Sequence, residues 1–374
     1  MTKLAELPRE VASIDEVPTP ALVLDSQKVA ANIQRMAAYG QQHGLGIRPH
    51  TKTHKSVKLA QMQLAAGACG LTVAKVGEAE VMADTGAELL IAYPVFSQAR
   101  RYRVAELARD QTVIVAIDSQ LAADALAAAA QQVGSTIGIL VDLDVGMGRT
   151  GVPTPQAALQ LAQHVAAQRG LRLEGIMCYP GHIWKAPALQ VEPLAAVSAK
   201  LRETLDLWRS SGLAARIVSG GSTPTAYQSH LVPEFTEIRP GTYIFNDLNE
   251  WLGGYSTAQQ CAAKIVVTVI SNAVAGQIVV DGGSKTFTSD MCVADRERGF
   301  GHVIEAPDAR IVRLSEEHGQ VDVRQVASPP QLGQRLTVVP NHICPCVNLQ
   351  NYAWWLRDDG SLERLTIDAR GLLS

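Results

Sequence analysis

The sequence has few aromatic and few charged residues, and it lacks long apolar runs. Aromatic residues make up 5% and charged residues 18% of the 374 residues, whereas hydrophobic residues reach 47%. This composition supplies a large core and excludes a globally disordered chain. No apolar stretch approaches the roughly 18 residues that span a bilayer, and the N-terminal segment lacks the apolar region of a secretory signal. We therefore expect neither a membrane span nor a secretory signal.

An excess of charge of one sign is also missing, and cysteine is sparse. The net charge is −3 and the isoelectric point is near 6.3, which leaves no basic footprint for nucleic acid. Six cysteines are too few for a disulfide scaffold in a chain of this length. These features predict a cytoplasmic protein with mostly buried thiols. The length indicates two domains, or one large barrel with an appendage.

Short apolar runs alternate with Ala- and Leu-rich helical patterns through the first two-thirds of the chain. The runs are continuously apolar, as expected for parallel strands that are covered on both faces. Eight such units in about 200 residues predict a (β/α)8 barrel; a doubly wound open sheet is the weaker alternative. The predicted strands are Gly46–Lys52, Gly70–Lys75, Glu88–Tyr93, Thr112–Asp118, Ile137–Asp144, Leu171–Tyr179, Ala215–Gly220 and Glu237–Phe245.

The pattern changes after Asn246, where strand-like runs separated by Gly, Pro and Asn replace the helical periodicity. This texture predicts a C-terminal, mostly β domain. The run Thr19–Asp25 precedes the first barrel unit, so we expect it to pair with that domain. The predicted division is a barrel over residues 26–250 and a β domain made of residues 1–25 and 251–374.

The first predicted strand ends at Lys52, and the second ends at Lys75. In a barrel of this kind, functional groups collect at the carboxyl ends of the strands. A lysine there is partly desolvated, which makes its amine a nucleophile suited to a Schiff base. From position alone, either lysine could instead be a surface residue that begins the following loop.

The fifth predicted strand runs into Asp144–Gly151, which contains a literal G-x-G-x-x-G. We reject a dinucleotide site, because Pro153 and Pro155 interrupt entry into a helix and no acid ends the next strand. The segment is better interpreted as a flexible turn that holds Arg149 over the barrel mouth, although Arg149 could be a solvated loop charge.

The loops after the seventh and eighth strands have the composition of a phosphate site. Ser222 and Thr223 offer hydroxyls and backbone amides next to a helix start, and Gly241 permits a second backbone segment to approach. Barrels of this type commonly bind phosphate at these two loops. A lysine at one strand end with a phosphate cradle opposite suggests pyridoxal phosphate.

The segment from Pro340 to Cys346 carries candidate metal ligands. If it is extended, His342 and Cys344 face the same way and could bind one metal ion, with Cys346 behind them. An imidazole and a thiolate suit zinc. Two ligands leave open positions for water or substrate. The polar run at Glu317 and His318 could be a second shell of this site or a plain turn.

Together these motifs resemble the D-serine dehydratase/D-threonine aldolase family. Its members are pyridoxal-phosphate enzymes with an alanine-racemase-type barrel and a C-terminal β domain. The resemblance runs from Thr19 to the C-terminal His-x-Cys, and its most specific elements are RPHTKTHK (48–55), DVGMGRTGV (144–152), SGGSTPT (219–225), RPGTY (239–243), EEHG (316–319) and PNHIC (340–344).

The resemblance assigns roles to individual residues. It implies Lys52 as the Schiff-base lysine, with Arg149 at the cofactor ring and Tyr179 near the pyridine nitrogen. The phosphate contacts implied are Thr223, Gly241 and Thr242, and the implied metal ligands are His342 and Cys344.

Two signals disagree over which branch of the family the sequence follows. The dehydratase branch typically has His-x-Cys, as at His342 and Cys344, whereas Tyr179-x-Gly181-His182 is similar to the aldolase branch. We favour a zinc-assisted dehydration of a D-β-hydroxy-α-amino acid, such as D-serine or D-threo-3-hydroxyaspartate, with Lys52 as base. Retro-aldol cleavage with His182 as base is the alternative. An amino-acid racemase and a non-catalytic cofactor carrier fit less well, and the resemblance implies a homodimer.

Overall fold

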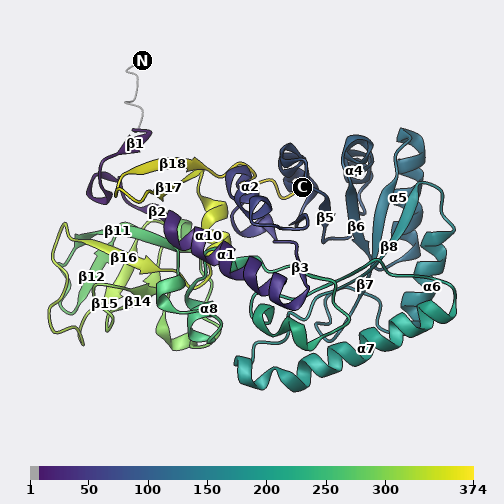
Figure 1. The fold of residues 1–374 in the computed structure, drawn as a ribbon. Coiled ribbons are helices and arrows are strands. Elements are labelled where there is room, and N and C mark those ends of the chain that lie inside the picture. Colours follow the sequence, from purple (N-terminus) through teal and green to yellow (C-terminus); the bar gives the residue numbers. More distant parts are fainter. Residues whose placement is uncertain (1–7) are drawn as a thin grey trace, which may run out of the picture. The chain divides into compact units, whose positions relative to one another are not determined.

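The computed structural model describes residues 8–374 and divides them into two compact units (Figure 1). The barrel unit comprises Ile33–Tyr243 with Gly371–Ser374, and the β unit comprises the residues up to Asn32 with Ile244–Arg370. Residues 1–7, which the sequence-based division assigns to the β domain, lie outside the described residues. Within residues 8–374, no helix is long and apolar enough to cross a bilayer.

The barrel unit is built on eight parallel strands in the order β3-β10-β9-β8-β7-β6-β5-β4. An isolated parallel bridge between His50 and Thr72 joins β3 to β4 and closes the sheet. The (β/α)8 prediction is therefore confirmed. The strands are β3 (Gly46–Ile47), β4 (Leu71–Val73), β5 (Leu89–Ile91), β6 (Val113–Ile117), β7 (Ile137–Leu143), β8 (Leu171–Cys178), β9 (Ile217–Gly220) and β10 (Glu237–Ile238).

Helices of the barrel unit cover the outside of these strands (Figure 1). Two of them begin at a hydroxyl cap: Ser119 Oγ accepts from Ala122 N at 3.3 Å, and Thr154 Oγ1 accepts from Ala157 N at 3.1 Å. The helices are α1 (Ser26–His43, which begins in the β unit), α2 (Val57–Ala65), α3 (Val76–Met82), α4 (Gln98–Asp110), α5 (Gln120–Val133), α6 (Pro155–Ala166) and α7 (Val191–Ser210), with 3-10 turns η2 (Thr51–Thr53), η3 (Ala83–Thr85), η4 (Pro187–Leu189), η5 (Ala226–Leu231) and η6 (Thr242–Ile244).

The eighth strand is shorter than predicted. The apolar run Glu237–Phe245 continues past β10, but the strand itself ends at Ile238. Pro240 has no N–H for a ladder bond, and the chain turns into η6 directly after Gly241. The turn brings Gly241 and Thr242 to the carboxyl ends of the strands instead of burying them in the sheet.

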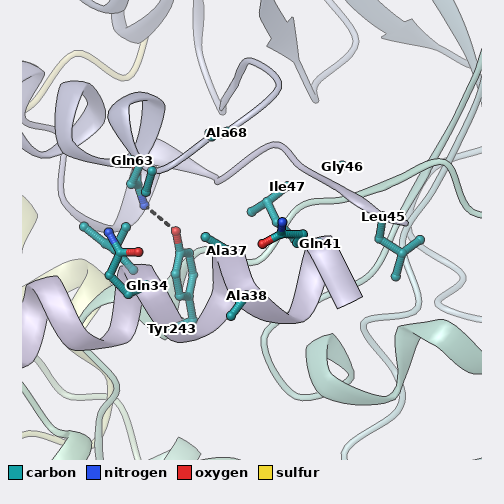
Figure 2. A pocket seen from close by; sticks show the side chains of 13 residues that line it. Gln34, Ala37, Ala38, Gln41, Leu45, Gly46, Ile47, Gln63, Ala68 and Tyr243 are labelled. Carbon is teal, nitrogen blue, oxygen red and sulfur yellow. Dashed lines mark hydrogen bonds between the residues drawn. The ribbon is translucent and has the colours of Figure 1, made fainter. Parts of the chain in front are cut away.

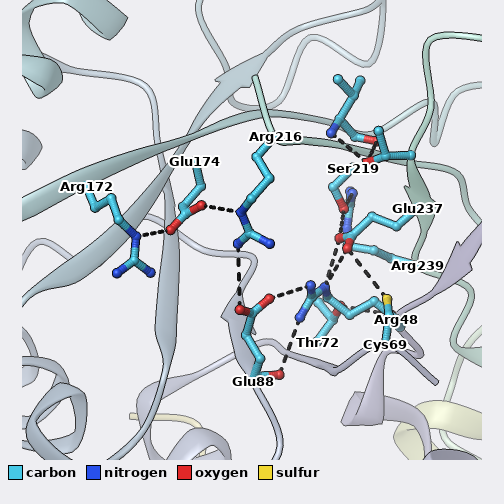
Figure 3. A network of polar contacts seen from close by, with 12 residues as sticks. Arg48, Cys69, Thr72, Glu88, Arg172, Glu174, Arg216, Ser219, Glu237 and Arg239 are labelled. Atoms are coloured by element: carbon cyan, nitrogen blue, oxygen red, sulfur yellow. Dashed lines mark hydrogen bonds and ion pairs between the residues drawn. The ribbon is translucent and has the colours of Figure 1, made fainter. Parts of the chain in front are cut away.

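The barrel interior changes from apolar to charged along its axis. An apolar layer is formed by buried side chains from five neighbouring strands: Leu90, Ile114, Ala116, Leu140, Met177 and Ile217. Towards the amino ends of the strands lies a network of charged side chains (Figure 3). There Arg48 pairs with Glu237 at 2.8 Å and with Glu88 at 2.7 Å, and Arg216 pairs with Glu174 at 2.7 Å.

Buried charges of this kind remain ionised only when they are paired. Burial alone would raise the pKa of Glu237, but the Arg48 guanidinium and the Ser219 hydroxyl hold it below its ordinary value. Arg239 extends the network toward the carboxyl ends of the strands, because it donates to Ser219 Oγ at 2.7 Å and to the Cys178 carbonyl at 2.8 Å. The charged layer therefore supports the strand ends on which the candidate site is built.

The β unit contains a mixed sheet in the order β1-β18-β17-β2-β11-β12-β15-β14, with β16 paired to both β11 and β13. Strand β2 pairs antiparallel with β11 and parallel with β17, which confirms the prediction for Thr19–Asp25. The strands are β1 (Glu10–Val11), β2 (Ala21–Asp25), β11 (Ala263–Ser271), β12 (Gln277–Val280), β13 (His302–Val303), β14 (Arg310–Leu314), β15 (Gly319–Asp322), β16 (Arg335–Val339), β17 (Tyr352–Leu356) and β18 (Leu362–Thr366).

Short helices complete the β unit, and one part of its core lies around β2. Val23, Val266, Trp354 and Leu362 pack together there. The helices and turns are η1 (Ile14–Glu16), α8 (Leu248–Leu252), η7 (Ala258–Gln260), α9 (Ser284–Phe287), η8 (Arg296–Arg298) and α10 (Ile343–Leu349). The domain borders predicted at 25/26 and 250/251 stay predictions; the borders of the compact units lie at 32/33 and 243/244.

Candidate active site

Lys52 lies on the turn η2, five residues after β3 ends at Ile47, so the predicted strand Gly46–Lys52 is shorter than expected. Beyond β3 the backbone stays in the sheet, with His50 N donating to Pro240 O at 2.9 Å, and then tightens into η2. Thr51 Oγ1 donates to the Thr72 carbonyl at 3.1 Å and ties this turn to β4. Lys52 is half-buried on the turn, so its amine stands at the rim of the barrel interior.

The two other lysines of this region have different surroundings. Lys55 is buried and pairs with Glu78 at 2.5 Å, so an acidic partner balances the charge of its ammonium group. The Lys75 ammonium lies over the Tyr93 ring, 3.7 Å from the ring centre. Among the described residues, no ion pair holds Lys52. Of the three, Lys52 has the amine that is least committed to the fold.

The predicted phosphate residues converge on one side chain. Thr223 Oγ1 accepts from the amide of Gly241 at 3.2 Å and from the amide of Thr242 at 3.0 Å. Ser222 is buried, and both its amide and its hydroxyl bond to Thr225 Oγ1, at 3.1 and 3.0 Å. These two amides and the Thr223 hydroxyl are donors of the kind that bind phosphate, although here both amides donate to Thr223 Oγ1.

Gly241 also brings this cluster against the lysine turn. A Cβ atom at position 241 would lie 2.9 Å from Thr53 Oγ1 and 3.3 Å from His50 Cβ. Any side chain there would push the loop after β10 away from η2. The lysine turn and the phosphate cluster therefore face each other across a glycine, which fits a ligand held by both.

Three aspartates anchor the loop that carries Arg149. Asp144 Oδ1 accepts from the amides of Gly146 and Gly148, at 3.0 Å each. Asp118 Oδ2 accepts from the Gly151 amide at 3.2 Å, and Asp142 Oδ2 accepts from the Thr150 hydroxyl at 2.8 Å. Burial alone would raise the pKa of Asp144, but the amides of this loop lower it. The predicted flexible turn is thus held by its own acids.

Arg149, Tyr179 and His182 meet above this loop. The Arg149 guanidinium lies 4.9 Å from the centre of the Tyr179 ring. The exposed His182 ring packs on Gly146, where a Cβ atom would lie 2.9 Å from His182 Cε1. Gly146 has a φ of 123°, a conformation that other residues rarely adopt. The structure therefore brings together the three residues that the sequence predicted at the ends of the fifth and sixth strands.

The segment of the candidate metal ligands is helical, and the prediction of an extended strand is wrong. Asp247 Oδ2 accepts from the Ile343 amide at 3.0 Å, and α10 begins there. Ile343 lies 96 residues away from Asp247, so the local pattern could not reveal this cap. His342 and Cys344 nevertheless remain within hydrogen-bond reach of each other.

His342 is oriented by an acidic neighbour. Its Nδ1 bonds to Asp290 Oδ2 at 3.0 Å, so Nε2 is the ring nitrogen that could ligate a metal ion. Burial alone would lower the pKa of His342, but the adjacent Cys344 and Asp247 raise it to about 10. Groups that favour a positive charge on this ring would also attract a metal cation.

The donor set fits a divalent ion. His342 and Cys344 supply nitrogen and sulfur, and the carboxylate oxygen Oε2 of Glu250 is buried without a hydrogen-bond partner. Burial, together with Asp247 and Cys344, raises the pKa of Glu250 well above its ordinary value. Within residues 8–374, however, no three His, Cys, Asp or Glu side chains are grouped closely enough to form a complete metal site. His342 and Cys344 as a two-ligand metal site therefore stay a prediction.

Family models divide the chain much as the fold does. Residues 24–248 match the alanine racemase N-terminal domain, and residues 262–355 match the putative serine dehydratase domain. A D-threonine aldolase from Arthrobacter sp is 31% identical over 362 residues, covering 95% of this chain and 93% of that protein. A D-threo-3-hydroxyaspartate dehydratase from Delftia sp. (strain HT23) is 32% identical over 348 residues, covering 87% and 90%.

The chain belongs to the D-serine dehydratase/D-threonine aldolase family. The resemblance seen in the sequence is confirmed, and the chain is a pyridoxal-phosphate-dependent lyase. Solved relatives agree. The D-threonine aldolase from Filomicrobium marinum has a TM-score of 0.89 at 29% identity, covering 99% of this chain and 100% of that one. The Delftia enzyme has a TM-score of 0.88 at 29% identity, covering 95% and 98%, and a variant of it has been solved in a metal-free form.

Cys346 and Glu317, whose roles the sequence left open, both contact neighbouring groups of the fold. Cys346 is buried, and its Sγ donates to the carbonyls of Phe287 at 3.3 Å and His342 at 3.2 Å. Glu317 lies in an exposed turn between β14 and β15 and pairs with Lys285 at 2.7 Å. The run around His318 is therefore a turn held by an ion pair. Cys346 is committed to backbone carbonyls.

Sequence patterns missed several polar residues that support the lyase site. Arg239 lies under the barrel mouth, and Asp142 anchors the Arg149 loop. Asp247 caps α8 by accepting from Glu250 N at 3.1 Å, in addition to holding α10. Asp247 could have been found, because an Asp followed three residues later by a Glu is typical of a helix start.

Proposed function

We propose that this lyase acts on D-β-hydroxy-α-amino acids and dehydrates them to an α-keto acid and ammonia, with D-serine or D-threo-3-hydroxyaspartate as the substrate type. The observation that carries the proposal is the convergence of the phosphate cluster on the lysine turn, at Gly241 and Thr53. Relatives named for dehydratase and aldolase activities support the substrate class.

Each barrel residue has a defined task in this proposal. When bound, pyridoxal phosphate supplies an electron sink for the pair left at the α-carbon. Thr223 and the amides of Gly241 and Thr242 hold the phosphate group, with Ser222 behind them. Arg149 and Tyr179 hold the ring. Lys52 would hold the cofactor through Nζ, and with substrate in the site the same atom would accept the α-proton.

His342 Nε2 and Cys344 Sγ would hold a zinc-like ion in the β unit. Such an ion supplies Lewis-acid polarisation, which assists a hydroxyl group in leaving as hydroxide. Asp290 keeps Nε2 available by accepting from Nδ1. A thiolate ligand suits zinc.

Retro-aldol cleavage to glycine and an aldehyde is the second candidate, and His182 favours it. The ring is exposed beside the Arg149 loop, where an imidazole could accept the proton of a substrate hydroxyl. The two reactions differ in the bond that breaks. Dehydration breaks Cα–H and Cβ–O, whereas cleavage breaks O–H and Cα–Cβ.

Product analysis of the purified enzyme tests the proposal. The enzyme, loaded with pyridoxal phosphate and zinc, is incubated with D-serine, D-threonine and D-threo-3-hydroxyaspartate, with the L-enantiomers as controls. Ammonia and an α-keto acid in equal amounts support dehydration. Glycine and an aldehyde from D-threonine, without ammonia, would show that His182 is the better guide. Equal rates with the L-enantiomers would contradict the substrate class.

The homodimer and the cytoplasmic location remain predictions from the sequence and the family resemblance. Light scattering of the purified protein measures the first directly.

A further inference from the structure

A buried chain of hydrogen bonds connects the lysine turn to the phosphate segment. His54 Nε2 bonds to Gln63 Oε1 at 3.1 Å, and Gln63 Nε2 donates to the Tyr243 hydroxyl at 2.9 Å. All three side chains are almost fully buried, with exposed fractions of 0%, 2% and 4%. Gln63 lies on α2, 180 residues before Tyr243, so the chain is purely a product of the tertiary fold.

The direction of each bond in this chain is determined. The Ser56 amide donates to His54 Nδ1 at 3.1 Å, so the proton of the neutral ring lies on Nε2 and is donated to Gln63. Burial lowers the pKa of His54 to about 4, which keeps the ring neutral. The Gln63 amide then has its NH2 group facing Tyr243. The His54 and Gln63 side chains therefore each donate to a buried acceptor.

The two ends of the chain belong to the two halves of the cofactor cradle. His54 follows η2 directly and is two residues from Lys52. Tyr243 follows Thr242, whose amide belongs to the phosphate cluster. Gln63 thus spans between the segment that would hold the cofactor covalently and the segment that would hold its phosphate.

Side-chain packing does not fill the space beside this connection. A cavity of about 410 Å3 lies between α1 and α2, and Gln63 and Tyr243 line it (Figure 2). Its wall also includes the buried apolar side chains Ile33, Leu45 and Ile47, together with small or exposed ones such as Ala38 and Gln34. With a cavity on this side, the polar chain replaces the close packing that would otherwise fix the two segments.

We propose that Gln63 is a positioning residue that holds the Lys52 turn and the Gly241–Tyr243 segment in register for pyridoxal phosphate. The proposal rests on the proposed function for the cofactor residues, and it adds a residue on α2 that touches neither substrate nor cofactor. Gln63 acts through His54 and Tyr243, so its loss should be seen first in cofactor affinity.

Two substitutions at position 63 separate the effect of the hydrogen bonds from the effect of side-chain size. Gln63→Met keeps the length but removes both hydrogen bonds, and we expect the dissociation constant for pyridoxal phosphate to rise about tenfold. Gln63→Glu can accept from His54. Towards Tyr243 it donates when protonated or accepts when ionised, so it should restore most of the affinity. Gln34→Met changes a residue that lines the same cavity but takes no part in the His54–Gln63–Tyr243 hydrogen bonds, and it serves as the matched control.

The dissociation constants are measured by fluorescence titration of the cofactor-free proteins, alongside their melting temperatures. Tyr243→Phe is the second route if Gln63→Met does not fold, because it removes only the acceptor of the Gln63 amide. The double variant that combines Gln63→Met with Tyr243→Phe should lose little more affinity than Gln63→Met alone, since both substitutions break the same hydrogen-bond network.

Unchanged cofactor affinity in Gln63→Met, or an equal loss in Gln34→Met, would overturn the proposal. Additive losses in the double variant would do the same. A wild-type enzyme that binds pyridoxal phosphate but converts no D-β-hydroxy amino acid contradicts the proposed reaction, while the affinity comparison still decides the role of Gln63.

Discussion

At the scale of single residues, the candidate site depends on which polar groups the fold leaves uncommitted. Lys55 and Lys52 lie three residues apart, yet only Lys55 is neutralised by a buried acid, Glu78. Asp142 and Asp144 lie at the same strand end but also differ in their hydrogen-bond partners. Asp144 accepts two backbone amides, whereas Asp142 is buried with one hydroxyl donor. Partner groups, more than residue type, determine what each side chain can do.

Lys52→Ala should abolish both activity and the visible absorbance of protein-bound pyridoxal phosphate, because no other amine takes its place at the end of β3. Absorbance spectra of the reconstituted protein and a turnover assay measure the two effects. Lys75→Met serves as the control and should retain the absorbance. Retained absorbance in Lys52→Ala, with loss in Lys55→Met or Lys75→Met, would mean that the cofactor lysine is misassigned.

Asp142 should make the protein less stable as the pH rises. Burial raises its pKa from 3.8 to about 6, although the Thr150 hydroxyl and Arg239 act in the opposite direction. The folded protein therefore binds this proton more tightly than the unfolded chain does, and the stability it contributes is lost between about pH 4 and pH 6. Asp142→Asn should be more stable than wild type by up to about 3 kcal/mol above pH 7 and equal near pH 4.

Urea unfolding of both proteins at acid, intermediate and neutral pH measures this difference. Asp110→Asn, on the outer helix α4, is the control and should leave the pH profile unchanged. Parallel profiles for wild type and Asp142→Asn would rule out the buried carboxyl as the cause.

At the scale of elements, short turns at strand ends carry the chemistry, and each is held by a group from elsewhere. The turn η2 is tied to β4 through Thr51 and to α2 through the His54–Gln63 bond. The helix α10 begins because Asp247, at the start of α8, accepts from its first amide. One acid thereby sets two helices beside each other and determines where His342 and Cys344 lie.

Asp247→Ala should weaken metal binding without unfolding the protein. It removes the cap of α8 and the anchor of α10, which together cost about 1–2 kcal/mol of stability. The ligand pair would lose its fixed spacing, so zinc affinity should fall, measured by competition with a chromogenic chelator. Asp290→Asn is an informative companion, because it removes the acceptor on His342 but leaves α10 intact. Wild-type zinc affinity in Asp247→Ala would contradict this role for the α8–α10 connection.

At the scale of the whole molecule, the barrel unit and the β unit have separate tasks and separate cores. The barrel unit carries the candidate cofactor residues, and ion pairs of Arg48 hold its strands near their amino ends (Figure 3). The β unit supplies the candidate metal ligands from a sheet that incorporates the N-terminal strand β2. A metal held by only two protein ligands should therefore serve catalysis and not folding.

Chelation of the metal should abolish turnover while the fold and the bound cofactor persist. Circular dichroism, cofactor absorbance and turnover are recorded before and after dialysis against a chelator, and zinc is then added back. Restored activity supports the two-ligand site. Full activity of the metal-free enzyme, or loss of the circular dichroism signal, would contradict it.

Local apolar runs and the residues that follow them were sufficient to predict the barrel, the β domain and the turns that carry Lys52, Arg149 and Thr223. The surroundings of these residues depend on the tertiary fold. The pairing of Gln63 with Tyr243 and of Asp247 with Ile343 joins residues 180 and 96 positions apart. Such contacts leave no periodic trace, since a hydrogen bond depends on distance in space and not along the chain.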